Sequence, residues 1–114
     1  MDLLTPEDRA QLLANGQRTA DGVEHDPFPV VKLFTPDAAA TWLLTEIDPH
    51  NPDIAFGLCD LGFGMPELGF VSLSELAKVR GKLGLPVERD MSFKADRPLS
   101  RYAEEARHAG IIRA

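Results

Sequence analysis

The fold is decided by the central stretch from Val30 to Val71, which reads VVKLFTPDAAATWLLTEIDPHNPDIAFGLCDLGFGMPELGFV. In this stretch, segments rich in β-branched and aromatic residues alternate with short segments rich in proline, glycine, aspartate and asparagine. Such alternation is typical of β-strands separated by turns. We predict four consecutive strands, at residues 30–35, 41–48, 54–61 and 67–71.

The connections between these predicted strands are short. A parallel return needs about a dozen or more connecting residues, so short connections favour antiparallel neighbours. We therefore predict an antiparallel β-meander. A further extended segment, from Leu85 to Phe93, is expected to add a strand, and Pro86 favours an edge position for it because proline cannot donate to a central ladder.

Helices are predicted before and after the strand region in the sequence. Thr5 and Pro6 suit the cap and first position of an N-terminal helix, which we expect to end at Asn15-Gly16 and to be followed by a loop over residues 17–29. The run Ser72-Leu73-Ser74-Glu75 matches a capping box and predicts a short middle helix.

A C-terminal helix is predicted from about Leu99 to Ala109, with Gly110 as its stop signal. The predicted fold class is therefore α+β, with an antiparallel β-meander of about four to five strands and three helices. We expect residues 1–114 to form a single globular domain.

Composition is that of an ordinary globular protein, with 44% hydrophobic and 26% charged residues. The sequence has no apolar run of about 18 residues and its N-terminus does not resemble a signal peptide, so a cytoplasmic protein with no membrane partner is expected. The single cysteine, Cys59, cannot form an internal disulfide, in agreement with a reducing compartment.

The net charge of −6 is unevenly distributed along the chain. Up to Ala77 there are 13 acidic and three basic residues, whereas from Lys78 onward there are nine basic and five acidic residues. The two parts could interleave in the fold, which is our expectation, or could present surfaces of opposite sign. Direct nucleic-acid binding is not expected from a chain with this net charge.

Acidic side chains and one imidazole cluster around the turn that follows the second predicted strand. Carboxylates suit magnesium or calcium and histidine suits transition metals, so this cluster is a candidate metal site. The candidate ligands are Glu46, Asp48, His50, Asp53 and Asp60. Aspartate, asparagine and proline are also the ordinary residues of a tight turn, and a plain solvated turn is the preferred interpretation.

Other catalytic patterns find no support. Gly62-Phe63-Gly64 precedes a predicted strand, whereas a phosphate-binding loop precedes a helix. Cys59 lies in an apolar segment beside Asp60, and both surroundings raise a thiol pKa, which indicates a structural cysteine. No catalytic residue and no cofactor is predicted, so an enzyme is not favoured.

Aromatic residues are interpreted as core. Trp42 is expected to be a buried anchor of the sheet, because leucines follow it in its strand. The phenylalanines are also expected inside, since the predicted strands lack the interleaved lysines and arginines of a base-stacking surface. These phenylalanines are Phe34, Phe56, Phe63 and Phe70.

Four of the segments quoted above also carry a family resemblance: residues 31–37, 41–46, 54–62 and 67–73. Through them, and most specifically through Trp42 and Cys59-Asp60, the chain resembles the family called domain of unknown function 2958, over nearly its whole length. The resemblance implies a bacterial origin and a frequent setting in plasmids and other mobile elements. It supplies no activity and no catalytic residue.

Three functions stay open at this point. The first is a non-enzymatic accessory or protein-interaction module, whose partner would be another protein. The second is a metal-assisted hydrolase or small-molecule enzyme built on the acidic turn, and the third is an acidic decoy for a basic nucleic-acid-binding protein. The sequence leaves the oligomeric state open.

Overall fold

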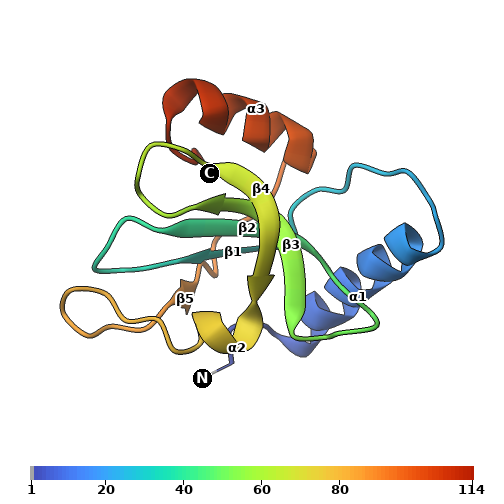
Figure 1. Ribbon diagram of the computed structural model, residues 1–114, viewed down its shortest axis with the longest axis horizontal. Helices are drawn as coiled ribbons and strands as arrows, with labels where there is room; N and C mark the ends of the chain where they lie inside the picture. The colour runs from blue at the N-terminus through green and yellow to red at the C-terminus, as the bar shows by residue number, and fades with distance from the viewer. Residues whose placement is uncertain (1) are drawn as a thin grey trace.

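The computed structural model describes residues 2–114 and contains one five-stranded antiparallel sheet with helices on both faces (Figure 1). The predicted α+β class is confirmed. The strands are β1 (Val31–Phe34), β2 (Thr41–Ile47), β3 (Ile54–Asp60), β4 (Glu67–Ser72) and β5 (Glu88–Arg89). The helices are α1 (Pro6–Ala20), α2 (Leu73–Leu76) and α3 (Leu99–Ala109).

The strand order in the sheet is β4-β3-β2-β1-β5. The first four strands form the predicted meander, and each pairs with its neighbour in sequence. Strand β5 pairs with β1 at the far edge, as Pro86 indicated, but it is only two residues long. The sheet therefore has two edges of unequal length, and β4 is the longer one.

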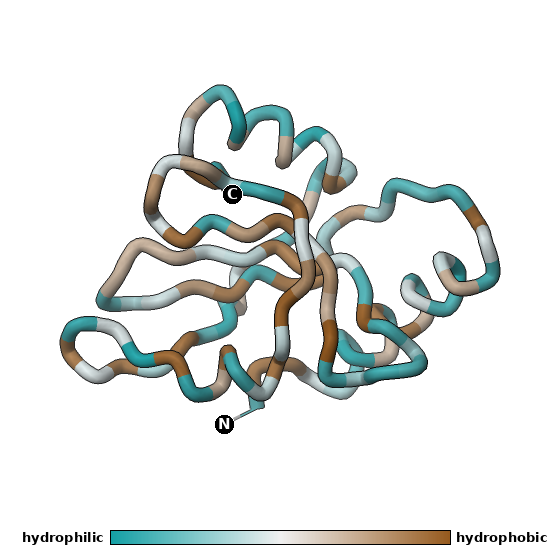
Figure 2. The backbone as a smooth tube through the Cα atoms, in the orientation of Figure 1, coloured by the Kyte–Doolittle hydropathy of each residue, from teal (hydrophilic) through white to brown (hydrophobic). Residues whose placement is uncertain are grey.

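Each face of the sheet has its own hydrophobic cluster. Trp42 and Leu44 of β2 pack with Leu12 of α1, on what we call the α1 face. Leu43, the residue between them, packs with Leu58 and α3 on the opposite, α3 face. Figure 2 shows hydrophobic residues concentrated along the central strands, whereas α3 is mainly hydrophilic on its outer side. Successive side chains of β2 thus alternate between two separate hydrophobic clusters, one on each face of the sheet.

The prediction that the first helix ends at Asn15-Gly16 is wrong, because α1 continues to Ala20. Both residues are buried against β2. Asn15 Nδ2 donates a hydrogen bond of 2.8 Å to the Thr45 carbonyl oxygen. A Cβ atom at Gly16 would lie 1.8 Å from the carbonyl oxygen of Ile47, so glycine is required for this close approach. The pair that resembled a stop signal is the helix–sheet contact.

Strand β2 also contains an irregularity that strict alternation does not predict. Its register with β3 shifts between Leu44 and Glu46, in the manner of a β-bulge. As a result Ile47 joins Leu44 in the α1-face cluster, three positions further along the strand. Glu46 is left on the α3 face, where it lines a surface groove.

The helix ends follow from local sequence. Ser72 caps α2 by accepting a hydrogen bond of 3.2 Å from the Glu75 amide, although α2 is only four residues long. Gly110 ends α3 with a φ of 74°, in the left-handed region that glycine adopts readily. No helix in the described part of the chain has the length and apolarity needed to span a bilayer.

The segment between α1 and β1 is shorter than predicted and is fastened to α3. The carbonyl oxygen of Pro27 accepts a hydrogen bond of 3.0 Å from the Leu99 amide. The Asp26 carboxylate accepts one of 3.1 Å from the Ser100 amide, in the first turn of α3. These contacts fix residues 23–27 beside the α3 face.

Candidate functional site

The five residues of the predicted acidic turn separate in the fold: Glu46, Asp48 and His50 line one surface depression, whereas Asp53 and Asp60 lie elsewhere. Asp53 precedes β3 and Asp60 ends it, so the length of that strand separates them. Asp48 Oδ1 accepts a hydrogen bond of 2.8 Å from the His50 amide, within the turn itself. Among residues 2–114, no three histidine, cysteine, aspartate or glutamate side chains come together as a group that could hold a metal ion. The part of the chain that the structure describes thus holds no such group at the predicted turn.

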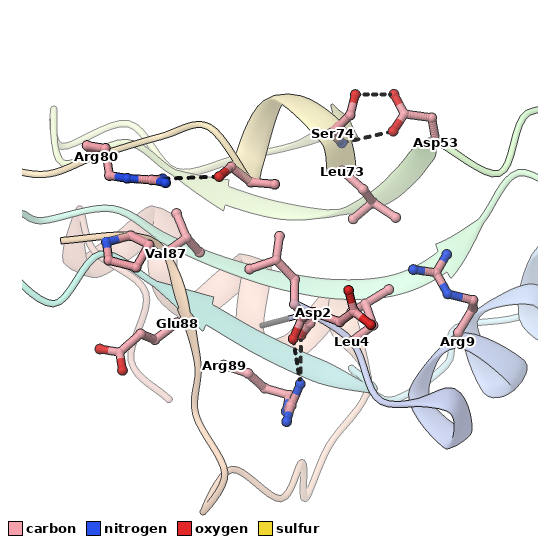
Figure 3. A pocket seen from close by; sticks show the side chains of 13 residues that line it. Asp2, Leu4, Arg9, Asp53, Leu73, Ser74, Arg80, Val87, Glu88 and Arg89 are labelled. Atoms are coloured by element: carbon pink, nitrogen blue, oxygen red, sulfur yellow. Dashed lines mark hydrogen bonds between the residues drawn. The ribbon is translucent and has the colours of Figure 1, made fainter. Parts of the chain in front are cut away.

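Asp53 has a structural role. Its carboxylate accepts hydrogen bonds from the Ser72 hydroxyl at 2.6 Å and from the Ser74 amide at 2.8 Å. These two hydrogen bonds lower the pKa of Asp53 below its ordinary value. Asp53 thus joins the turn before β3 to the start of α2 (Figure 3).

Asp60 is also structural, at the other end of β3. Its side chain is 1% exposed and accepts hydrogen bonds from the backbone amides of Gly62 and Ile112, at 2.9 and 3.0 Å. The carboxylate therefore holds the segment after α3 against the β3–β4 turn.

Cys59 behaves as the sequence indicated. Burial raises the pKa of its thiol to about 11, so the thiolate is scarce at neutral pH. A thiol of this kind is a poor nucleophile. The prediction of a structural cysteine is consistent with this surrounding.

One surface groove, which we call the arginine groove, lies between α2, the N-terminal segment and β5 (Figure 3). Its volume is about 550 Å³ and its walls carry Leu4, Leu73 and Val87. Its charged lining residues are Asp2, Arg9, Asp53, Arg80, Glu88 and Arg89. Acidic and basic groups are therefore mixed along the rim.

The guanidinium groups of the arginine groove are partly engaged by the chain itself. Arg80 donates to the carbonyl oxygen of Val79 at 2.8 Å, and Arg89 donates to that of Leu3 at 3.1 Å. These bonds fix the segments that form the groove. The arrangement supplies no converging set of reactive groups.

A second groove, the aromatic groove, lies on the α3 face beside residues 23–27. It consists of two adjoining depressions of about 460 and 300 Å³ that share Thr19, Glu46, Phe56 and Phe70. Its acidic lining residues are Glu24, Asp26, Glu46 and Asp48. No lysine or arginine of the described chain lines either depression.

The floor of the aromatic groove is apolar and open. The rings of Phe56 and Phe70 lie 5.0 Å apart, centroid to centroid, at a tilt of 59°. Phe70 is 69% exposed and its strand neighbour Leu68 is 46% exposed. The prediction that Phe70 belongs to the core is therefore wrong, as it is for Phe63, which is 79% exposed in the β3–β4 turn. Alternation predicts the face on which a side chain lies, but not whether a helix covers it there.

A polar cluster forms one wall of the aromatic groove. The Thr19 hydroxyl, from the last turn of α1, donates to Glu46 Oε2 at 2.7 Å and lies 2.7 Å from His25 Nε2. The Glu46 side chain is 17% exposed and that of His25 is 10% exposed. Within residues 2–114, His25 Nδ1 is buried without a hydrogen-bond partner.

Sequence reasoning selected Glu46 but missed the residues around it. Thr19 and His25 lie in the segment 17–29, which is predicted to be a loop and in which no site residue is selected. The available signal was the run Glu24-His25-Asp26. These three titratable residues follow α1 in the sequence and come before Pro27 and Pro29. Their approach to Glu46 depends on the extension of α1 beyond Gly16.

One ion pair, between Lys32 and Asp90, joins the two parts of the charge asymmetry, and it does not use the acidic excess of the first part. The ion pairs among residues 2–114 are Lys32 with Asp90, Arg97 with Asp96 and with Glu105, and the contact of His25 with Glu46. None of these joins an acidic residue before Lys78 to a basic residue after it. Part of the acidic excess of the first part lines the aromatic groove.

Comparison with known proteins identifies a family. The family model described as "Protein of unknown function (DUF2958)" matches residues 3–113, which is nearly the whole chain. Neither the comparison with curated proteins nor that with solved structures found a match. Function must therefore be argued from the geometry of this chain.

Proposed function

This chain belongs to the DUF2958 family, and we propose that it is a protein-interaction module that receives an extended segment of a partner protein along β4. The observation that carries the proposal is that β4 is an edge strand with exposed apolar side chains. It is the longer of the two edge strands of the sheet, and it presents Leu68 and Phe70 to solvent. A bacterial origin and an association with mobile elements are part of the same proposal and rest on the family resemblance alone, and a cytoplasmic location is proposed from the sequence pattern.

An outer strand presents unpaired backbone donors and acceptors along one side. Extended peptides bind such edges by adding a strand, with main-chain hydrogen bonds for affinity and side-chain pockets for specificity. Proteins usually protect their edges with charges, prolines or very short strands. Strand β5 is short in this way, whereas β4 has six residues and a single charged one, Glu67.

The apolar surface continues beyond β4 into the preceding turn. Met65 is 72% exposed and Phe63 is 79% exposed, and both lie within the turn that leads into the strand. Contiguous exposed apolar residues of this kind mark interaction sites on soluble proteins. The surface therefore combines backbone groups that can pair with an added strand and apolar side chains whose burial would favour binding.

The proposal is tested by selecting binders from a display library of random short peptides with the wild-type chain as bait. We expect enriched peptides that bind the wild-type chain and lose at least roughly tenfold in affinity for Phe70→Ser, because the ring would be buried by the added strand. Leu83→Ser is the matched control, since Leu83 is 81% exposed but lies in the loop after α2.

Two results would contradict the proposal. One is a selection that enriches no peptide, and the other is a set of peptides that bind the wild-type chain and Phe70→Ser equally well. Sedimentation of the chain alone accompanies the selection. If β4 pairs with β4 of a second copy and thereby excludes peptides, the chain is a self-associating protein and not a receptor for a partner segment.

A further inference from the structure

Three side chains of the aromatic groove form a row across the sheet. Glu46 of β2 is the Cα partner of Phe56 of β3, and Phe56 is in turn the partner of Phe70 of β4. Residues directly opposite each other on paired strands project to the same face. The row therefore leads from the outer strand inward, over two aromatic rings, to a carboxylate.

Apart from two histidines, the titratable side chains that line the groove around this row are all acidic. The acidic side chains of the groove are accompanied by no lysine or arginine of the described chain. His25 lies beside Glu46, with Nε2 3.8 Å from Glu46 Oε2. Aromatic faces and carboxylates both attract cations, so the floor and the rim favour the same kind of ligand.

The carboxylate of Glu46 is held in position before any ligand arrives. Its Oε2 atom accepts a hydrogen bond from the Thr19 hydroxyl. The side chain is mostly buried between α1 and the loop that carries His25. A fixed, partly desolvated carboxylate interacts more strongly with a cation than an exposed and mobile one. The groove is thus preorganised for positive charge.

We infer that the aromatic groove selects a cationic side chain, lysine or arginine, of the partner segment, with its stem on the rings of Phe56 and Phe70 and its charge directed toward Glu46. The inference rests on the proposed function, because β4 supplies the backbone that would align the segment. A strand added to β4 would extend the row by one residue, and a long side chain at that residue would lie over Phe70.

The experiment uses the peptides selected with the wild-type chain. We expect lysine or arginine to be enriched at one fixed position. Replacing that residue by norleucine, which keeps the apolar stem and removes the charge, should weaken binding to the wild-type chain by roughly tenfold. The same replacement should have a much smaller effect on binding to Glu46→Gln, because the carboxylate that distinguishes the two peptides is absent.

Glu67→Gln is the matched control. It removes the same charge from β4 itself, but Glu67 does not line the groove. The preference for lysine over norleucine should survive in this variant. Phe70→Leu is a second test, because it keeps an apolar side chain and removes the ring; we expect it to retain binding while reducing the preference for the cation.

The outcomes separate this inference from the proposed function. Peptides that depend on Phe70 but show no preference for lysine or arginine overturn the inference and leave the proposed function intact. A loss of preference in Glu67→Gln as large as in Glu46→Gln shows general charge attraction and overturns the assignment to the groove. A library that enriches no peptide overturns both.

Discussion

The two faces of the sheet are covered to different extents. On the α1 face, α1 and α2 close over Trp42, Leu44 and Ile47, which are between 0% and 3% exposed. On the α3 face, α3 covers Leu43 and Leu58 but leaves Phe70 69% exposed. Under the proposed function, the α1 face supplies stability and the uncovered part of the α3 face binds the partner segment.

The largest expected effect is that of Trp42→Ala on the α1 face. Trp42 is 3% exposed, as predicted, and removing its side chain leaves a cavity in a closed cluster. We expect the free energy of unfolding to fall by about 3 to 5 kcal/mol, measured by urea denaturation. If the variant melts within a degree or two of the parent, the α1 face does not supply the stability assigned to it.

A smaller loss is expected for Gly16→Ala, at the contact between α1 and β2. The new Cβ would lie 1.8 Å from the Ile47 carbonyl oxygen, so helix and sheet must move apart. Overpacking of this kind costs roughly 1 to 3 kcal/mol. Gly69→Ala in β4 is the control, since a Cβ there meets nothing within 4 Å. Equal losses at the two glycines would remove the contrast between covered and uncovered regions.

The hydrogen bonds that join Asp53, in the turn before β3, to the start of α2 give a pH-dependent prediction. The hydrogen bonds from Ser72 and Ser74 lower the pKa of Asp53 in the folded chain, so its stabilising contribution is present above the ordinary carboxyl pKa and is lost as the pH falls through the lowered value. Asp53→Asn should therefore be less stable than the parent at neutral pH, and the difference should shrink in acid.

The measurement for Asp53 is urea denaturation of both chains from neutral pH to well below about 4, the ordinary pKa of an aspartate, so that the range includes the lowered pKa of the folded chain. A difference in stability that stays constant over this range would show that the carboxylate charge is not what fastens α2.

The smallest effect on stability is expected for Phe70→Ser. The side chain is mostly exposed, so its replacement should change the free energy of unfolding by no more than about 0.5 kcal/mol. The expected loss of peptide binding in this variant would then be a local effect. A destabilisation comparable to that of Trp42→Ala would place Phe70 in the structural core after all.

Much of the fold could be predicted because its signals are local. Strand alternation, the Thr5 and Ser72 caps and the Gly110 stop each depend on a few neighbouring residues, and the structure confirms them. The role of Asn15-Gly16 could not be predicted in this way. A helix stop and a helix–sheet contact both use small polar residues, and only the position of β2 distinguishes them.

The candidate site was less predictable than the fold for the same reason. Thr19 and Glu46 are 27 residues apart in sequence and meet through the packing of α1 on β2. The acidic residues near the turn were close in sequence, yet strand β3 separates Asp53 from Asp60. The exposure of Phe70 depends on how far α3 extends over the sheet, which no residue near Phe70 specifies.

The most direct test of the division between the two faces is the location of a bound peptide. A ¹⁵N-labelled chain is titrated with the selected lysine peptide, and the amide shifts are mapped by NMR. We predict that the largest shifts fall on Glu46, Phe56 and Phe70 and along β4, with little change around Trp42. Largest shifts in the arginine groove, at Arg9 and Arg89, would contradict the account.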